Sequence, residues 1–104
     1  MAKARIIWTD EARWWLHEIR EYIAKDSPTA ANRTIDGIYQ KVQLLAKHPE
    51  AGFKYPLPGR DDIRVLLYGH YRIAYVLTDD VSVSILGVFH SALNIDRYFP
   101  DAQR

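Results

Sequence analysis

Three short apolar segments in the second half of the chain carry the side chains best suited to chemistry. Arg64 and Arg72 can bind a phosphate or a carboxylate, because a guanidinium pairs with either group through parallel hydrogen bonds. Tyr71 and Tyr75 accompany them, and His90 follows at the end of the last segment. An imidazole titrates near neutral pH and can serve as an acid or a base. Strongly polar residues in apolar strands are informative, since a buried charge must be paired or face an open surface.

Each of these residues also has a structural explanation. A strand arginine is more often ion-paired or extended toward solvent. Arg64 and Arg72 would form a basic ladder if both pointed to one face, and that arrangement favours a binding role. Tyr71 and Tyr75 share a face of their strand, a spacing more typical of packing than of a reaction centre. His90 has no evident orienting carboxylate, which is more typical of a structural histidine.

The rest of the sequence excludes several kinds of site. There is no cysteine, so disulfides, thiol nucleophiles and cysteine metal sites are absent. No glycine-rich phosphate loop or serine nucleophile elbow is present. The adjacent carboxylates at 10–11, 61–62 and 79–80 point different ways and suit caps and turns rather than acid–base pairs. No histidine pair has helical metal-ligand spacing, so we expect no metal and no cofactor, and residue types alone do not favour an enzyme.

Length and charge limit the possibilities further. The chain has 104 residues, enough for one domain with one modest core. Its net charge is +1, so the chain as a whole does not attract nucleic acid strongly. The first residues lack the apolar run of a signal peptide, and no segment has the roughly 18 apolar residues of a membrane helix. A cytoplasmic location without membrane contact is therefore expected.

The apolar spacing predicts a single α+β domain over residues 1–104. Residues 5–8 are β-prone, and Thr9 or Asp10 can then cap a helix. Residues 25–28 end that helix, and Ser27 as N-cap with Pro28 at the first helical position starts a second one. Because the turn between them is short, the two helices should form an antiparallel hairpin. The apolar face of the first helix comprises Ala12, Leu16, Ile19, Tyr22 and Ile23, with Trp15 at its border.

The second half of the chain reads as a connector followed by strands. Residues 49–62 are rich in proline and glycine, and a connector of this length is often functional or lies along a sheet edge. Three strands follow, over about 63–68, 71–77 and 81–89, as an antiparallel meander with a partly ordered tail at 91–104. Apolar positions fall on both pleat faces. The helix hairpin should therefore cover one face of a mainly antiparallel sheet, while another segment partly shields the other face.

The segments YIAKDSPTAANRTIDGI, LLAKHPEAG, DDIRVLLYGHYRIAYVL and ILGVFHSALNIDRYF together cover nearly the whole chain. Their order resembles the ParE/RelE superfamily of toxins from type II toxin–antitoxin systems, nearer the ParE side. The resemblance implies a toxin neutralised by a cognate antitoxin, whose segment folds as it binds. It also implies DNA gyrase as the target and contact with operator DNA only through the antitoxin. Trp14 falls off the apolar stripe and could be an interface residue, or it could pack against the tail.

The superfamily divides by target, and this sequence departs from the RelE-like branch. Those toxins cleave mRNA in the ribosome with clustered basic residues. Here Leu67 and the segment Ser91-Ala92-Leu93 stand where they carry arginines, and such side chains cannot stabilise a dianionic phosphorane. His90 and Tyr98 are the candidate proton-transfer residues if the protein is instead a ribosome-dependent endoribonuclease. A third possibility is a non-toxic module that only binds an antitoxin.

The sequence thus favours a gyrase inhibitor that acts by binding, with no catalytic residue assigned. The residues expected to contact the target or partner are Arg60, Arg64, Arg72, Tyr75 and Trp14.

Overall fold

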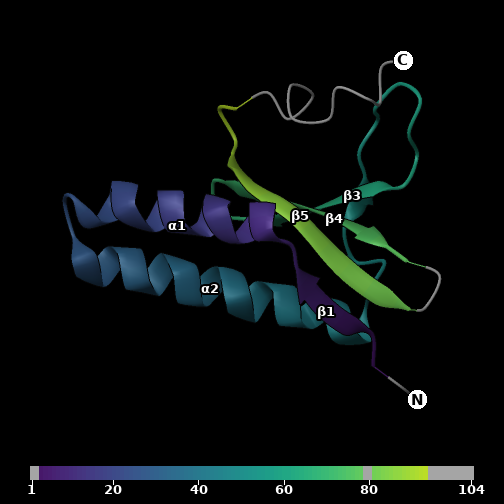
Figure 1. Ribbon diagram of the computed structural model, residues 1–104, viewed down its shortest axis with the longest axis horizontal. Coiled ribbons are helices and arrows are strands. Elements are labelled where there is room, and N and C mark those ends of the chain that lie inside the picture. Colours follow the sequence, from purple (N-terminus) through teal and green to yellow (C-terminus); the bar gives the residue numbers. More distant parts are fainter. Residues whose placement is uncertain (1–2, 79–80, 94–104) are drawn as a thin grey trace.

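The computed structural model describes residues 3–78 and 81–93 and has the predicted α+β architecture. Two helices lie side by side as a hairpin that packs on a five-stranded sheet and extends beyond it (Figure 1). None of the helices in these ranges is long and apolar enough to cross a membrane. The elements in chain order are β1 (Arg5–Trp8), α1 (Asp10–Ala24), α2 (Pro28–Lys47), β2 (Phe53–Lys54), β3 (Ile63–Tyr68), β4 (Tyr71–Leu77) and β5 (Ser82–His90).

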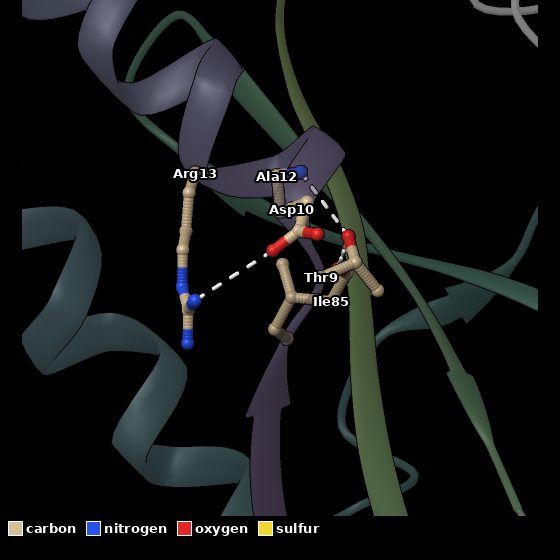
Figure 2. Close-up of polar contacts among 5 residues, drawn as sticks. All are labelled: Thr9, Asp10, Ala12, Arg13 and Ile85. Atoms are coloured by element: carbon tan, nitrogen blue, oxygen red, sulfur yellow. Dashed lines mark hydrogen bonds and ion pairs between the residues drawn. The ribbon is translucent and has the colours of Figure 1, made fainter.

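Both helices begin at the residues that the sequence predicts. Thr9 is the N-cap of α1, and its hydroxyl accepts a hydrogen bond from the Ala12 N–H at 3.1 Å. The same hydroxyl donates to the Ile85 carbonyl at 2.7 Å, so the cap also joins the start of α1 to β5 (Figure 2). Ser27 caps α2 by accepting from the Ala30 N–H, and Pro28 occupies the first turn. These side-chain oxygens satisfy amide groups that a helix leaves unpaired at its start.

The sheet has the strand order β1-β5-β4-β3-β2. The three strands β3, β4 and β5 form the predicted antiparallel meander, and β1 pairs with β5 in parallel. The connector contributes β2 at the outer edge, where Phe53 lies opposite Val65 and Lys54 opposite Arg64. The connector therefore follows a sheet edge, one of the possibilities that its length and composition left open.

One irregularity in β5 decides which of its side chains face the helices. Tyr75 lies opposite Ile85, whereas the preceding Ala74 lies opposite Gly87, so Leu86 is an extra residue in β5. Side chains alternate along a strand, and an inserted residue reverses that alternation. Ile85 and Val88, three positions apart, can therefore both join the core beneath the helices.

The sheet buries apolar residues on both faces, as the sequence predicts. The core under the helix hairpin includes Leu16, Ile38, Leu45, Ile73 and Ile85. The core on the opposite face consists of Leu57, Ile63, Ala74 and Phe89, with Tyr55 and Leu93 packed against it. Tyr55 and Leu57 belong to the connector, so this segment supplies part of the cover for the second face.

Candidate functional site

Arg64 and Tyr75 act together to hold the turn 49–52 that follows α2. Tyr75 is fully buried, and its hydroxyl donates to the Pro49 carbonyl and accepts from the Gly52 N–H, both at 2.9 Å. Arg64 lies opposite Tyr75 in the strand register, and its Nη1 donates to the carbonyl oxygens of Gly52 at 2.7 Å and Glu50 at 3.2 Å. The structure therefore uses Tyr75 as an internal residue and offers no part of it to a partner.

The environment of Tyr75 keeps its hydroxyl protonated at neutral pH. Burial raises the pKa of Tyr75, while the hydrogen bond from the Gly52 N–H and the charge of Arg64 act in the opposite direction. The turn also approaches the sheet very closely, because a Cβ at Gly52 would lie 2.7 Å from the Val65 carbonyl oxygen. A side chain at position 52 would displace the turn from this contact.

Arg72 lies on the other face of the sheet. It pairs with Leu67, which is three positions along β3 from Arg64, and side chains three apart on a strand point to opposite faces. The Arg72 Nη2 donates to the Leu93 carbonyl at 2.5 Å. Arg64 and Arg72 therefore form no basic ladder, and each binds a backbone carbonyl on its own side of the sheet.

The other predicted contact residues differ in how accessible they are. The Arg60 guanidinium forms two hydrogen bonds with the Asp62 carboxylate, at 2.9 and 2.7 Å, and thereby lowers the pKa of Asp62. Trp14 is 53% exposed, and its ring meets the edge of Trp15 at a centroid distance of 5.0 Å. Tyr98, the second candidate proton-transfer residue, lies outside the described residues. Of the predicted contact residues Trp14 and Arg60, Trp14 is therefore the more accessible.

An open groove lies between the second half of α1 and the end of β5. We call it the α1–β5 groove, and its volume is about 480 Å³. Apolar and aromatic side chains make up most of its lining, as is usual for binding sites. Its lining residues are Trp15, Glu18, Ile19 and Tyr22 from α1, Tyr71 from β4, Val88 and His90 from β5, and then Ala92 and Leu93.

His90 is the predicted site residue that lies in this groove. Its ring packs against the edge of Tyr71 at a centroid distance of 5.6 Å and stacks on His70 at 6.1 Å. Its Nδ1 accepts a hydrogen bond from the Ala92 N–H at 3.1 Å, so the proton of the neutral ring resides on Nε2. Burial raises the pKa of Tyr71, and the neighbouring Tyr22 phenol adds to this effect. The groove thus combines an imidazole, two phenols and the Glu18 carboxylate.

Within residues 3–78 and 81–93, no arginine or lysine lines the α1–β5 groove. Arg64 and Arg72 bind backbone carbonyls elsewhere on the sheet, as described above. Phosphoryl transfer depends on cations or other donors that stabilise the developing charge. No group of three or more potential metal-ligating side chains occurs in the same ranges. The described geometry suits binding of an apolar segment better than it suits phosphate chemistry.

The sequence alone did not single out the groove. Tyr22 was expected on the buried face of α1 but is 73% exposed at the groove. Glu18 carried no signal, because a charged residue beside an apolar stripe is typical of any surface helix. The sequence feature that could have indicated the groove is a pair of aromatic residues. Trp15 and Tyr22 make the apolar stripe of α1 wider than the core beneath it. β1 pairs only with residues 82–85 of β5 and so does not reach the end of β5 that borders the groove.

Sequence comparison assigns the family. Residues 6–94 match the family described as the ParE toxin of the type II toxin–antitoxin system parDE. The chain belongs to the ParE toxin family. It is also 39% identical over 94 residues to a Sinorhizobium fredii (strain NBRC 101917 / NGR234) protein named "Putative toxin Y4kP", an alignment that covers 88% of this chain and 92% of that protein.

Solved structures share the ParE-family fold. A chain from the chromosomal ParDE toxin–antitoxin system of P. aeruginosa matches with a TM-score of 0.70 and 19% identity, over 85% of this chain and 96% of that one. A chain from the toxin–antitoxin complex RelBE2 of Mycobacterium tuberculosis matches with a TM-score of 0.61 and 22% identity, over 86% and 93% respectively. At such identities the likeness concerns the fold alone.

Proposed function

We propose that this ParE-family chain arrests growth by binding and inhibiting DNA gyrase, and that a cognate antitoxin neutralises it by docking in the α1–β5 groove. The observation that carries the proposal is the composition of the groove, which is open and mainly apolar and aromatic. No arginine or lysine is among the described residues that line it. Such a surface fits an amphipathic segment that folds as it binds. Gyrase acts in the cytoplasm, so the proposed target places the toxin there, with operator DNA reached only through the antitoxin.

Two further residues support a role in binding rather than catalysis. Trp14 presents a large aromatic surface next to Trp15, and exposed tryptophans frequently dominate binding energy at interfaces. Arg60 lies in the connector, where its guanidinium is paired with the Asp62 carboxylate. We assign Trp14 to the partner or target interface and Arg60 to a secondary position, since recruiting Arg60 would require exchanging its carboxylate partner.

A parallel assay of the purified, antitoxin-free protein tests the proposal. One reaction follows DNA supercoiling by gyrase and accumulation of the gyrase–DNA cleavage complex, and the other follows mRNA cleavage on translating ribosomes. Gyrase inhibition without mRNA cleavage is the expected result. Trp14→Ala should weaken that inhibition, whereas the matched exposed change Tyr39→Ala on α2 should leave it unchanged.

The opposite result would support the runner-up function. mRNA cleavage without gyrase inhibition would make the protein an endoribonuclease, and loss of cleavage in His90→Ala with the fold intact would assign His90 to proton transfer. The placement of His90 beside Tyr71 and Glu18 is the observation that favours this alternative. Expression without any growth defect, in the absence of antitoxin, would instead indicate a non-toxic antitoxin-binding module.

A further inference from the structure

Two arginines and a glutamate of α1 lie on different sides of the helix. Arg13 and Arg20 line a surface cavity that α1 shares with α2. Glu18 lies on the opposite side, where it lines the α1–β5 groove. Along α1 the cations therefore face the neighbouring helix, and a carboxylate faces the groove.

Glu18 is not neutralised by a neighbour in the described ranges. It forms no ion pair or hydrogen bond with any residue of 3–78 or 81–93, whereas Arg13 pairs with Asp10 and Arg20 donates to the Asn32 side chain. A carboxylate at the edge of an apolar surface loses hydration when a partner covers it, and that loss is costly unless the partner supplies a cation. The charge of Glu18 therefore selects among the segments that could occupy the groove.

The aromatic residues around Glu18 also favour a cation. Trp15 is held by edge contacts with Trp14 and Phe89, at centroid distances of 5.0 and 4.9 Å. Tyr22 already attracts a cation, because the Lys25 Nζ lies 5.9 Å from its ring centroid. Aromatic faces stabilise ammonium and guanidinium groups, more strongly when water is excluded. A carboxylate with tryptophan and tyrosine rings nearby is thus a suitable site for a lysine or arginine side chain.

From these observations we infer that the α1–β5 groove recognises a lysine or arginine of the antitoxin segment, with Glu18 as its counter-ion. The aromatic rings of Trp15 and Tyr22 flank the cation. Apolar residues three or four positions away on the same amphipathic segment pack on Ile19 and Leu93, because residues at that spacing share a helix face. The inference rests on the proposed function, since it specifies the partner of the same groove.

The test measures binding of the protein encoded beside the toxin gene by isothermal titration calorimetry. Glu18→Gln keeps the shape of the side chain and removes its charge, and we expect at least about a tenfold loss of affinity. The matched control is Glu21→Gln, which makes the same change on the same helix outside the groove lining and should alter affinity by less than about twofold. Thermal unfolding of both variants verifies that the exposed changes leave the fold intact.

A double-mutant cycle identifies the partner's cation. Each lysine and arginine of the antitoxin's toxin-binding segment is changed to methionine and measured against wild-type toxin and Glu18→Gln. One of these changes should weaken binding to the wild type and have little further effect on Glu18→Gln. Equal affinity of Glu18→Gln and the wild type, or the absence of any coupled cation, would overturn the inference while leaving antitoxin binding intact. If the neighbouring protein does not bind the wild type at all, the proposed function fails as well.

A cation of the chain itself, such as Arg97, is the alternative to a cation of the partner, and the test includes it. Arg97→Gln in the full-length chain should leave antitoxin affinity unchanged if the cation comes from the partner. Tighter binding by Arg97→Gln, abolished when Glu18→Gln is also present, would show that Arg97 occupies the site and would overturn the inference.

Discussion

The turn 49–52 and the α1–β5 groove both place tyrosine hydroxyls and charged side chains beside an apolar core, and they differ in where those groups find partners. At the turn, Tyr75 and Arg64 donate to three backbone carbonyls, and Tyr75 accepts from the Gly52 N–H. In the groove, Glu18 has no partner among the described residues, and Tyr22 is mostly exposed. The same residue types therefore serve the fold in one region and leave a surface open in the other.

Polar residues beside an apolar core have different consequences when they are buried and when they are exposed. A buried polar group that is fully hydrogen-bonded stabilises one arrangement of the backbone, and removing it leaves its partners unsatisfied. A polar group on an open groove contributes little to stability and can instead select a ligand. Stability measurements should thus separate the two regions.

The largest expected difference in the free energy of unfolding is between variants at two positions of α1. Leu16→Ala should lower the free energy of unfolding by about 2–5 kcal/mol, because Leu16 is 4% exposed in the core under the hairpin. Tyr22→Ala, six residues along the same helix at the groove, should change it by no more than about 0.5 kcal/mol. Urea denaturation followed by tryptophan fluorescence measures both. A comparable loss in Tyr22→Ala would mean that the groove is part of the core rather than an open surface.

Tyr71 and Tyr75 of β4 provide a matched pair of positions, because the change to phenylalanine removes one oxygen atom at each. Tyr75→Phe should cost about 1–3 kcal/mol at pH 7, since the Gly52 N–H and the Pro49 carbonyl lose their buried partner. Tyr71→Phe should cost no more than about 0.5 kcal/mol, because no described residue hydrogen-bonds its hydroxyl. The same denaturation experiment compares them, and equal losses would show that the hydrogen bonds of Tyr75 stabilise the fold no more than the Tyr71 hydroxyl does.

A substitution at Arg64 distinguishes a structural role of this side chain from a role in binding the target. Arg64→Met keeps most of the apolar stem and removes the donors to Gly52 and Glu50, so we expect a loss of about 1.5 kcal/mol. Arg33→Met on the exposed surface of α2 is the control and should be nearly neutral. If Arg64→Met folds with wild-type stability yet no longer inhibits gyrase, Arg64 is a contact residue after all.

The smallest expected effect appears at alkaline pH. Burial raises the pKa of Tyr71, so the unfolded chain loses this proton at lower pH than the folded chain does. The corresponding stability is fully present below the ordinary tyrosine pKa of about 10 and is lost as the pH rises through the folded value. Wild type should lose more stability than Tyr71→Phe as the pH rises above about 10 in urea titrations. Parallel curves for the two proteins would show that Tyr71 is not shielded by the groove.

Much of the fold follows from local sequence signals. Thr9 and the pair Ser27-Pro28 start the helices because their side chains or ring satisfy requirements of the first turn, which depend on neighbouring residues alone. The boundaries of β3 and β4 also agree with the prediction, since turn residues delimit them. The last strand is shifted by one residue, to Ser82–His90, and the extra Leu86 was not predicted. A bulge depends on pairing with a distant strand, so local sequence does not specify it.

The sequence by itself determined the family, the order of elements and the residues with chemical potential, because these depend on residue types and their spacing. Only the tertiary structure decided that Arg64 and Arg72 lie on opposite faces, that Tyr75 is buried, and that Trp15, Glu18 and Tyr22 meet His90 in one groove. These facts follow from strand register, from the bulge in β5 and from the distance that β1 extends along β5. Each is a relation between segments far apart in the chain, and such relations are set by packing rather than by local preference.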